Sequence, residues 1–257
     1  MFKTDNYKNK TVVITGGTKG IGLGITKAYL SLSANVIILA RNKPKKQIQV
    51  KGNKALFYQC NVRDNANVEE VINEVFKANK CIDVLINNAG GAPLINSLDA
   101  SMNFNNAIID LNLNSSFTVS YYVAKKMIKK SSGCVITNIS SVTATRPTPG
   151  SAAYGAAKGG LVNLTKTLAV EWAPRIRVNS IITGYIETEN SLVHYGSKKD
   201  MKAVAKTIPM KRMGTPEDIA NACIFLSSAN SSWITGTAIE VHGGGESPTY
   251  LNSAKPK

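Results

Sequence analysis

The chain has 257 residues, 43% of them hydrophobic, and a formal net charge of +15. This length can bury a sizeable core in one unit, no linker divides it, and no apolar run is long enough to span a membrane. The first ten residues are too polar for a signal peptide, so we expect a single cytoplasmic domain over residues 1–257. The four cysteines (Cys60, Cys81, Cys134 and Cys223) are widely spaced, which predicts reduced thiols and no metal site.

Seven apolar, β-branched runs predict strands, and amphipathic stretches between them predict helices. The predicted strands are Thr11–Thr15, Val36–Ala40, Ala55–Cys60, Ile82–Asn87, Val135–Ser140, Arg177–Ile182 and Ala238–Val241. Strands that alternate with helices indicate an α/β, doubly wound Rossmann fold with a parallel seven-stranded sheet. In such a sheet the binding site lies at the carboxyl ends of the strands.

The first predicted strand runs directly into GGTKGIGLG and then into an amphipathic helix. Gly16, Gly20 and Gly22 allow a tight turn and a close approach of the backbone to a pyrophosphate. The N–H groups and dipole at the start of the helix would stabilise its charge. Because the spacing differs from the commonest dinucleotide fingerprint, and glycines also form ordinary turns, the segment alone is weak evidence.

The positive charge is concentrated near the N-terminus, where residues 6–63 contain eleven Lys and Arg and no Asp or Glu. A site for NAD places a carboxylate near the end of the second strand, whereas Arg41 follows that strand here. With Lys19 in the glycine turn, this pattern predicts NADP(H) over NAD(H). Other interpretations of the basic segment are a solvated lysine-rich surface or attraction of coenzyme A phosphates. No nucleic-acid partner is expected, because aromatic residues are not interleaved with the lysines.

Ser141, Tyr154 and Lys158 form a second informative pattern. Residues four apart share one face of a helix, so the Lys158 ammonium is expected beside the Tyr154 phenol. A nearby cation favours the phenolate and would bring the tyrosine pKa from about 10 towards neutrality. On its own, however, this pair also fits a solvated helix face.

Taken together, these motifs resemble the short-chain dehydrogenase/reductase family from Thr11 to Gly245. The stretches that carry the resemblance are TGGTKGIG (Thr15–Gly22), NNAG (Asn87–Gly90), DLNLNSSF around Asn112, RVNSIITGYIET (Arg177–Thr188) and IPMKRMGTPEDIA (Ile208–Ala220). Ser141, Tyr154 and Lys158 complete the active-site pattern of that family.

The resemblance implies that Tyr154 donates a proton to a substrate carbonyl while a nicotinamide delivers hydride. Ser141 would hydrogen-bond the developing oxyanion, and Lys158 would lower the tyrosine pKa and hold the nicotinamide ribose. Asn112, at a break in a helix from Phe104 to Lys130, would carry a water that relays protons. The residues implied to bind the cofactor are Gly16, Thr18, Lys19, Gly20, Ile21, Gly22, Arg41, Asn61, Val62, Asn88, Ala89, Gly90, Tyr154, Lys158, Gly184, Ile186 and Thr188.

Three positions depart from the family pattern. Asn61 replaces the usual aspartate, Thr183 replaces a proline, and His242 replaces an aspartate and is expected to be structural. His194 lies in a variable segment, where it could at most touch substrate.

The substrate segments are expected at 91–102 and 184–207. Residues expected to form an apolar pocket are Ala92, Pro93, Leu94, Val142, Tyr185, Ile186 and Leu192. Such a pocket would suit a 3-oxoacyl thioester, a steroid-like compound or another apolar ketone.

The helix expected from Ser151 to Trp172 has small or apolar residues around much of its circumference. By resemblance we expect a homotetramer. A non-catalytic dinucleotide sensor or scaffold is the alternative function.

Overall fold

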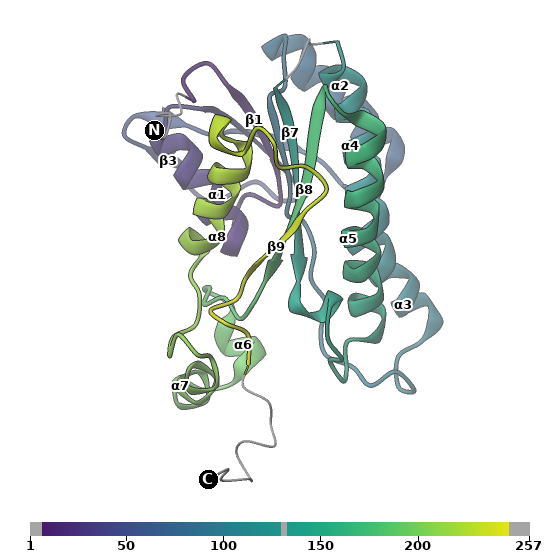
Figure 1. The fold of residues 1–257 in the computed structure, drawn as a ribbon, viewed down its shortest axis with the longest axis vertical. Coiled ribbons are helices and arrows are strands. Elements are labelled where there is room, and N and C mark those ends of the chain that lie inside the picture. The colour runs from purple at the N-terminus through teal and green to yellow at the C-terminus, as the bar shows by residue number, and fades with distance from the viewer. Residues whose placement is uncertain (1–6, 130–132, 247–257) are drawn as a thin grey trace.

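The computed structural model describes residues 7–129 and 133–246. Its centre is a parallel seven-stranded sheet with the order β5-β2-β1-β6-β7-β8-β9 (Figure 1). The strands are β1 (Thr11–Thr15), β2 (Asn35–Ala40), β5 (Leu56–Gln59), β6 (Val84–Asn87), β7 (Cys134–Ser141), β8 (Ile176–Thr183) and β9 (Ala238–Val241). All seven predicted strands are therefore present, with small differences at their ends, and the predicted α/β Rossmann fold is confirmed.

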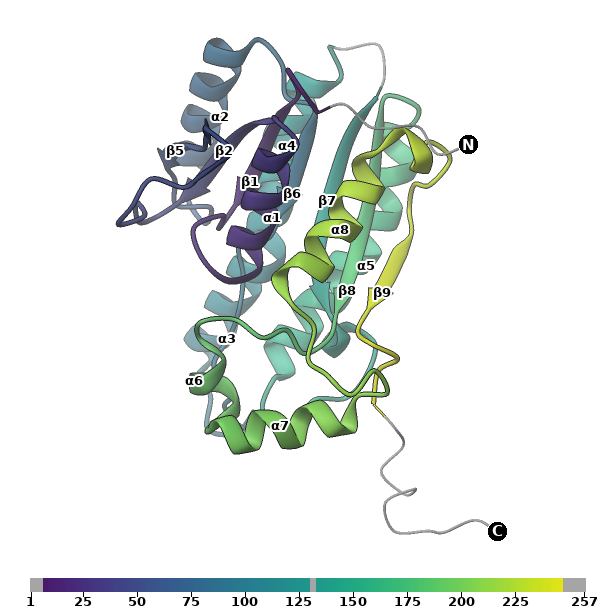
Figure 2. The same ribbon diagram turned by 90° about the vertical axis from the view of Figure 1, so that its left-hand side faces the viewer.

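Helices cover both faces of the sheet (Figures 1 and 2). One layer contains α1 (Gly20–Ser31) and α8 (Pro216–Ser227), and the other contains α2 (Asn65–Asn79), α4 (Ser115–Met127) and α5 (Ala152–Trp172). Successive strand residues point to opposite faces, so Val12 packs in the first layer and Val13 in the second. Burial on both sides explains why the strands read as continuous apolar runs.

The first layer joins the N-terminal part of the described chain to α8. The Tyr29 hydroxyl on α1 donates a hydrogen bond of 3.1 Å to the carbonyl of Cys223 on α8. The Tyr7 hydroxyl donates to the carbonyl of Ile224 at 2.9 Å, and the two tyrosine rings meet edge to face. The N-terminal segment and α8 are thus held together although they lie about two hundred residues apart.

The helix that precedes β7 is interrupted, as expected near Asn112. It consists of α3 (Met102–Ile109), one π-helical turn (Asp110–Asn114) and α4. A π turn has one more residue than an α turn, so it redirects the side chains on either side of it. The expected end of this helix at Lys130 lies outside the described residues.

A short hairpin of β3 (Gln49–Val50) and β4 (Asn53–Lys54) was not expected from the sequence. Further short elements lie near the carboxyl ends of the strands or connect them: two 3₁₀ turns (Val142–Ala144 and Ala229–Ser231), α6 (Ser191–Tyr195) and α7 (Lys198–Thr207). In Figure 2, α6 and α7 lie below the sheet. No helix in residues 7–129 and 133–246 has the length and apolarity needed to cross a membrane.

Candidate active site

A cleft of about 1920 Å³ opens where the parallel strands end. Pockets for one small molecule usually measure roughly 300–1,000 Å³, so this cleft has room for two ligands. The predicted site residues that line it are Gly16, Thr18, Lys19, Gly20, Ile21, Gly22, Arg41, Val62, Asn88, Ala89, Gly90, Ser141, Tyr154, Lys158, Gly184, Ile186 and Thr188. The segments recognised in the sequence therefore converge on one cleft.

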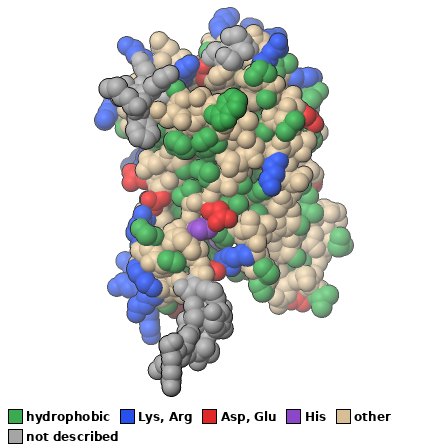
Figure 3. Space-filling model, viewed as in Figure 1, with side chains coloured by type: hydrophobic (Ala, Val, Ile, Leu, Met, Phe, Trp, Pro, Cys, Tyr) green, Lys and Arg blue, Asp and Glu red, His purple; other side chains and the backbone are tan. Residues whose placement is uncertain are grey.

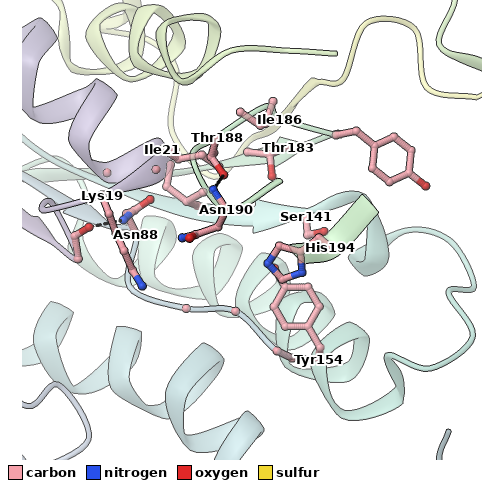
Figure 4. Close-up of a pocket in the computed structure, with 18 of the residues that line it drawn as sticks. Lys19, Ile21, Asn88, Ser141, Tyr154, Thr183, Ile186, Thr188, Asn190 and His194 are labelled. Atoms are coloured by element: carbon pink, nitrogen blue, oxygen red, sulfur yellow. Dashed lines mark hydrogen bonds between the residues drawn. The ribbon is translucent and has the colours of Figure 1, made fainter. Parts of the chain in front are cut away.

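The glycine turn after β1 is attached to the end of β6. The Thr15 hydroxyl accepts hydrogen bonds from the N–H groups of Asn88 and Ala89, at 2.9 and 3.0 Å. The Asn88 side chain donates to the carbonyls of Thr15 and Gly16 (Figure 4). Gly16 has a φ of +67°, and a side chain on Gly22 would collide with the Gly16 carbonyl. Glycine is required at both positions for the turn to close.

The start of α1 lacks a cap of its own. Lys19 at the N-cap position makes no side-chain hydrogen bond to the helix, and the first turn contains no acidic residue. Instead, the Gly20 N–H donates a hydrogen bond of 2.8 Å to Glu189 Oε1, which comes from the segment after β8. Free N–H groups at a helix start attract anions, and here the anion is a carboxylate of the chain itself.

The end of the cleft beside the glycine turn is basic. Lys19, Arg41, Lys43 and Lys45 all line it. Among the described residues that line the whole cleft, the carboxylates are those of Glu189 and Glu246, and neither follows β2. The arrangement suits a ligand with several negative charges at this end.

The other end of the cleft brings together the predicted catalytic residues. Ser141 is the last residue of β7, while Tyr154 and Lys158 lie on successive turns of α5. Figure 4 shows Ser141 and Tyr154 at the same end of the cleft, and the two side chains form a hydrogen bond. Lys158 is 3% exposed, and its Nζ donates a hydrogen bond of 2.8 Å to the Ile139 carbonyl. The Ser140 hydroxyl donates to the Lys158 carbonyl and so connects α5 to β7.

The expected effect of Lys158 on Tyr154 is not found. Burial raises the pKa of Tyr154, and a hydrogen bond with Ser141 opposes that rise. Lys158 Nζ lies over the tyrosine ring, 5.6 Å from its centroid, and donates elsewhere. Burial also lowers the pKa of Lys158 from 10.5 to about 8, so the lysine holds its proton weakly. The predicted lowering of the tyrosine pKa by this cation is therefore wrong for this structure.

Asn112 lies beneath the cleft and is fully buried. Its side-chain oxygen accepts from the Gly91 N–H at 2.8 Å, and its nitrogen donates to the carbonyls of Gly91 and Ile108 at 3.0 and 2.9 Å. It fixes the loop after β6 to the π turn. A side chain on Gly90 would start 2.6 Å from the Asn112 oxygen and 3.2 Å from Lys158 Nζ, so these groups are closely packed.

Asn61 is absent from the lining formed by the described residues, although its neighbours Cys60 and Val62 belong to it. Its N–H donates to the Asn67 side chain, and its side-chain oxygen accepts from the Arg63 N–H. The amide therefore stabilises the turn before α2.

The other two departures from the family pattern also have structural partners. The Thr183 hydroxyl donates to the Ser140 carbonyl at 2.9 Å. His242 Nε2 lies 2.7 Å from Glu240 Oε2, which fits the expected structural position at a strand end. Cys60, Cys134 and Cys223 are buried, and Cys81 is partly exposed.

The substrate end is only partly apolar. Ala92, Leu94, Val142, Tyr185 and Ile186 line it as expected. Pro93 and Leu192 are not among the described residues that line it, so that part of the expected pocket is wrong.

A polar corner made by Arg146, Tyr185 and Glu246 was missed. Arg146 donates to the Tyr185 hydroxyl at 2.9 Å and forms an ion pair with Glu246, with Nη1 and Oε2 3.0 Å apart. The three residues lie on loops distant in sequence, so only the fold reveals their contact. The sequence offered one signal for this corner, namely the charged Arg146 between Ser141 and Tyr154. His194 also lines the cleft.

Comparisons with known proteins agree with this geometry. The family model described as "Enoyl-(Acyl carrier protein) reductase" matches residues 16–246. The 3-oxoacyl-(acyl-carrier-protein) reductase FabG of Chlamydia pneumoniae is 36% identical over 242 residues, covering 91% of this chain and 96% of that protein.

Two solved structures have the same architecture throughout. Thermoplasma acidophilum aldohexose dehydrogenase matches with a TM-score of 0.86 and 31% identity, covering 98% of this chain and 97% of that one. A short chain dehydrogenase from Bacillus anthracis matches with a TM-score of 0.84 and 34% identity, covering 95% and 99%. The chain therefore belongs to the short-chain dehydrogenase/reductase family of oxidoreductases.

Proposed function

We propose that this protein is an NADP(H)-dependent oxidoreductase that interconverts a carbonyl and a secondary alcohol, with Tyr154 as the proton donor. The observation that carries the proposal is the position of Ser141, Tyr154 and Lys158 at one end of a cleft whose other end is the glycine turn. A hydride donor bound along the turn would thus reach a substrate beside the tyrosine.

The residues at the glycine turn fit a dinucleotide phosphate. The Gly20 N–H at the start of α1 already donates to a carboxylate oxygen at 2.8 Å, so the N–H groups there can donate to a pyrophosphate oxygen. Lys19 and Arg41 would hold the 2′-phosphate, and no carboxylate follows β2 to bind an unmodified ribose. The bound nicotinamide supplies the hydride, while the protein supplies position, charge and a proton.

The proton chemistry is assigned to the chain's own side chains. Tyr154 donates its hydroxyl proton to the substrate oxygen, and Ser141 hydrogen-bonds the same oxygen as it gains charge. Lys158, whose pKa is lowered to about 8, can return a proton to Tyr154 at neutral pH. In alcohol oxidation the same groups act in the reverse direction.

The substrate is proposed to be a 3-oxoacyl thioester, a steroid-like compound or another apolar ketone. Leu94, Val142 and Ile186 support an apolar chain or ring, while Arg146 supplies a polar corner. We further propose that the enzyme acts in the cytoplasm as a homotetramer.

A turnover assay tests the function. Oxidation of NADPH is followed by its absorbance with simple ketones, 3-oxoacyl thioesters, aldohexoses and 2-enoyl thioesters. We expect turnover with at least one carbonyl substrate and none with enoyl thioesters, which lack a carbonyl at the reacting carbon. Reduction of enoyl thioesters alone would contradict the assigned reaction. Tight NADPH binding without turnover of any compound would favour the non-catalytic sensor or scaffold.

A further inference from the structure

Glu189, in the segment after β8, contacts the start of α1 at the glycine turn. Oε1 of Glu189 accepts the Gly20 N–H at 2.8 Å, and the side chain is exposed. Figure 4 shows its neighbours Thr188 and Asn190 beside Ile21 of α1. The Thr188 methyl lies 3.6 Å from the point where a side chain on Gly20 would begin. The segment after β8 is therefore docked on the turn.

The docked carboxylate and a dinucleotide require the same position. The Gly20 N–H belongs to the uncapped first turn of α1, where a pyrophosphate would be bound. One N–H cannot donate well to both oxygens, and a carboxylate would repel a phosphate group placed beside it. The two anions must therefore occupy the turn alternately.

We propose that Glu189 sets the affinity of the cleft for its dinucleotide by competing with the pyrophosphate for the start of α1. This inference rests on the proposed function insofar as the natural competitor is NADP(H). Under this proposal Glu189 weakens cofactor binding, whereas Lys19 and Arg41 strengthen it. A consequence is that the cofactor must displace the Glu189 carboxylate from the Gly20 N–H when it binds.

The geometry allows Glu189 to leave without unfolding its surroundings. The Thr188 N–H donates to the Ser191 hydroxyl at 2.7 Å, and the Asn190 N–H donates to the Thr188 hydroxyl at 3.4 Å. These contacts hold the backbone within its own turn at the start of α6. Rotation of the exposed Glu189 side chain is then enough to free the Gly20 N–H.

Binding measurements test the competition. We expect Glu189→Ala to bind NADPH about two- to tenfold more tightly than the wild type, as judged from the usual strength of a carboxylate at a helix start. Glu189→Gln, which keeps a neutral acceptor, should lie between them. Glu187→Gln is the matched control, because Glu187 is exposed in the same segment and only its backbone N–H is bonded, to the Gly214 carbonyl. An unchanged or weaker affinity in Glu189→Ala would overturn the proposal.

Two readouts separate this inference from the proposed function. Inorganic pyrophosphate should bind more tightly to Glu189→Ala than to the wild type, whichever nucleotide the cleft prefers. Amide hydrogen exchange over residues 16–24 should be faster in unliganded Glu189→Ala than in the wild type and the Glu187→Gln control. If the wild type binds neither NADPH nor NADH, the proposed function fails, whereas these readouts still decide the role of Glu189. Equal exchange and equal pyrophosphate affinity would refute that role.

Discussion

Burial determines how the Lys158 amine behaves. Its pKa falls from 10.5 to about 8 because the charged form is poorly solvated inside the protein. Between these two pH values the unfolded chain binds a proton that the folded chain does not, so the free energy of unfolding rises with pH. Below about pH 8 the folded protein carries the buried charge. Its free energy of unfolding is then about 3 kcal/mol lower than above pH 10.5, where the amine is neutral in both states.

Replacing Lys158 by methionine should remove this pH dependence. We expect the stability of the wild type relative to Lys158→Met to increase by about 3 kcal/mol from pH 7 to pH 10.5. Urea unfolding at a series of pH values measures the difference. Lys166→Met, on the exposed side of α5, is the matched control. Parallel stability curves for wild type and Lys158→Met would show that the lysine is not destabilised by burial.

The Tyr154 hydroxyl is assigned the proton transfer. Tyr154→Phe keeps the ring and its packing, so we expect NADPH affinity to be retained while kcat falls by about 10²- to 10⁴-fold. Tyr121→Phe on α4, outside the described lining of the cleft, should leave kcat unchanged. Turnover by Tyr154→Phe within tenfold of the wild type would mean that another group donates the proton.

Arg41 is expected to distinguish the two nicotinamide cofactors. Because a charge-assisted hydrogen bond contributes about 1.5 to 3 kcal/mol, Arg41→Ala should weaken NADPH binding about 10- to 100-fold. NADH binding should change little, since it lacks the 2′-phosphate. Arg63→Ala, in the same basic segment but outside the described cleft lining, controls for net charge. Equal dissociation constants of the wild type for NADPH and NADH would refute the preference.

At the scale of elements, the π turn between α3 and α4 positions Asn112. The buried amide makes three hydrogen bonds to the backbone of Gly91 and Ile108. These bonds fix the position of the loop after β6. Gly90 in this loop lies close to Lys158. The geometry of the catalytic end thus depends on a residue that does not line the cleft.

Asn112→Leu should destabilise the protein by about 3 kcal/mol, because it removes all three hydrogen bonds of a fully buried amide, including the one to the buried Ile108 carbonyl. Denaturant unfolding measures the loss. Asn114→Ala is the control, since its amide bonds only to the exposed Asp110 side chain in the same turn, and it should change stability by less than about 0.5 kcal/mol. Equal stabilities of the two variants would show that the Asn112 bonds are unimportant.

The elements that the sequence predicts well are those with a strong local signal. Buried parallel strands such as β1 and β8 are nearly uniform in apolar residues, so their positions can be read directly. The hairpin of β3 and β4 has two residues per strand, too few for any periodicity. The glycine in its turn was a signal in the sequence. In the structure Lys51 and Gly52 both adopt the left-handed conformation typical of tight hairpins.

The site was predictable where its motifs are continuous in sequence. Tyr154 and Lys158 are four residues apart, which helix geometry places on one face, and the family resemblance adds Ser141 to them. The Arg146–Glu246 pair spans a hundred residues, and the contact of Glu189 with Gly20 spans 169, so no local pattern contains them. The direction of the Tyr154 pKa shift was missed for another reason: it depends on burial and on where the lysine amine points.

At the scale of the whole molecule, two apolar surfaces remain uncovered in the single chain. One lies on α4 and α5, where Val170 is 82% exposed and Phe117 and Tyr121 are nearly half exposed. The other lies near α8 and β9, where Trp233 is 98% exposed, and Figure 3 shows apolar side chains on this face. Exposed apolar surfaces of this kind are typical of subunit contacts.

Two surfaces on different sides would allow two twofold contacts, and we expect these to build the proposed tetramer. Light scattering at micromolar concentration should give four times the 27.5 kDa chain mass. Val170→Lys and Trp233→Lys should each reduce the assembly to a dimer, because each places a charge in one contact. Leu98→Lys, at an exposed loop position, is the control. A monomeric wild type would rule out both contacts.

The pairing of α1 with α8 also affects folding during synthesis on the ribosome. The Tyr29 hydroxyl cannot form its hydrogen bond until Cys223, 194 residues later, has been synthesised. At typical synthesis rates of about 5 to 20 residues per second, that delay lasts about 10 to 40 s. During this time the apolar side of α1 has no permanent cover. The nascent chain therefore passes through a period in which the side of α1 that packs against α8 is uncovered and open to aggregation.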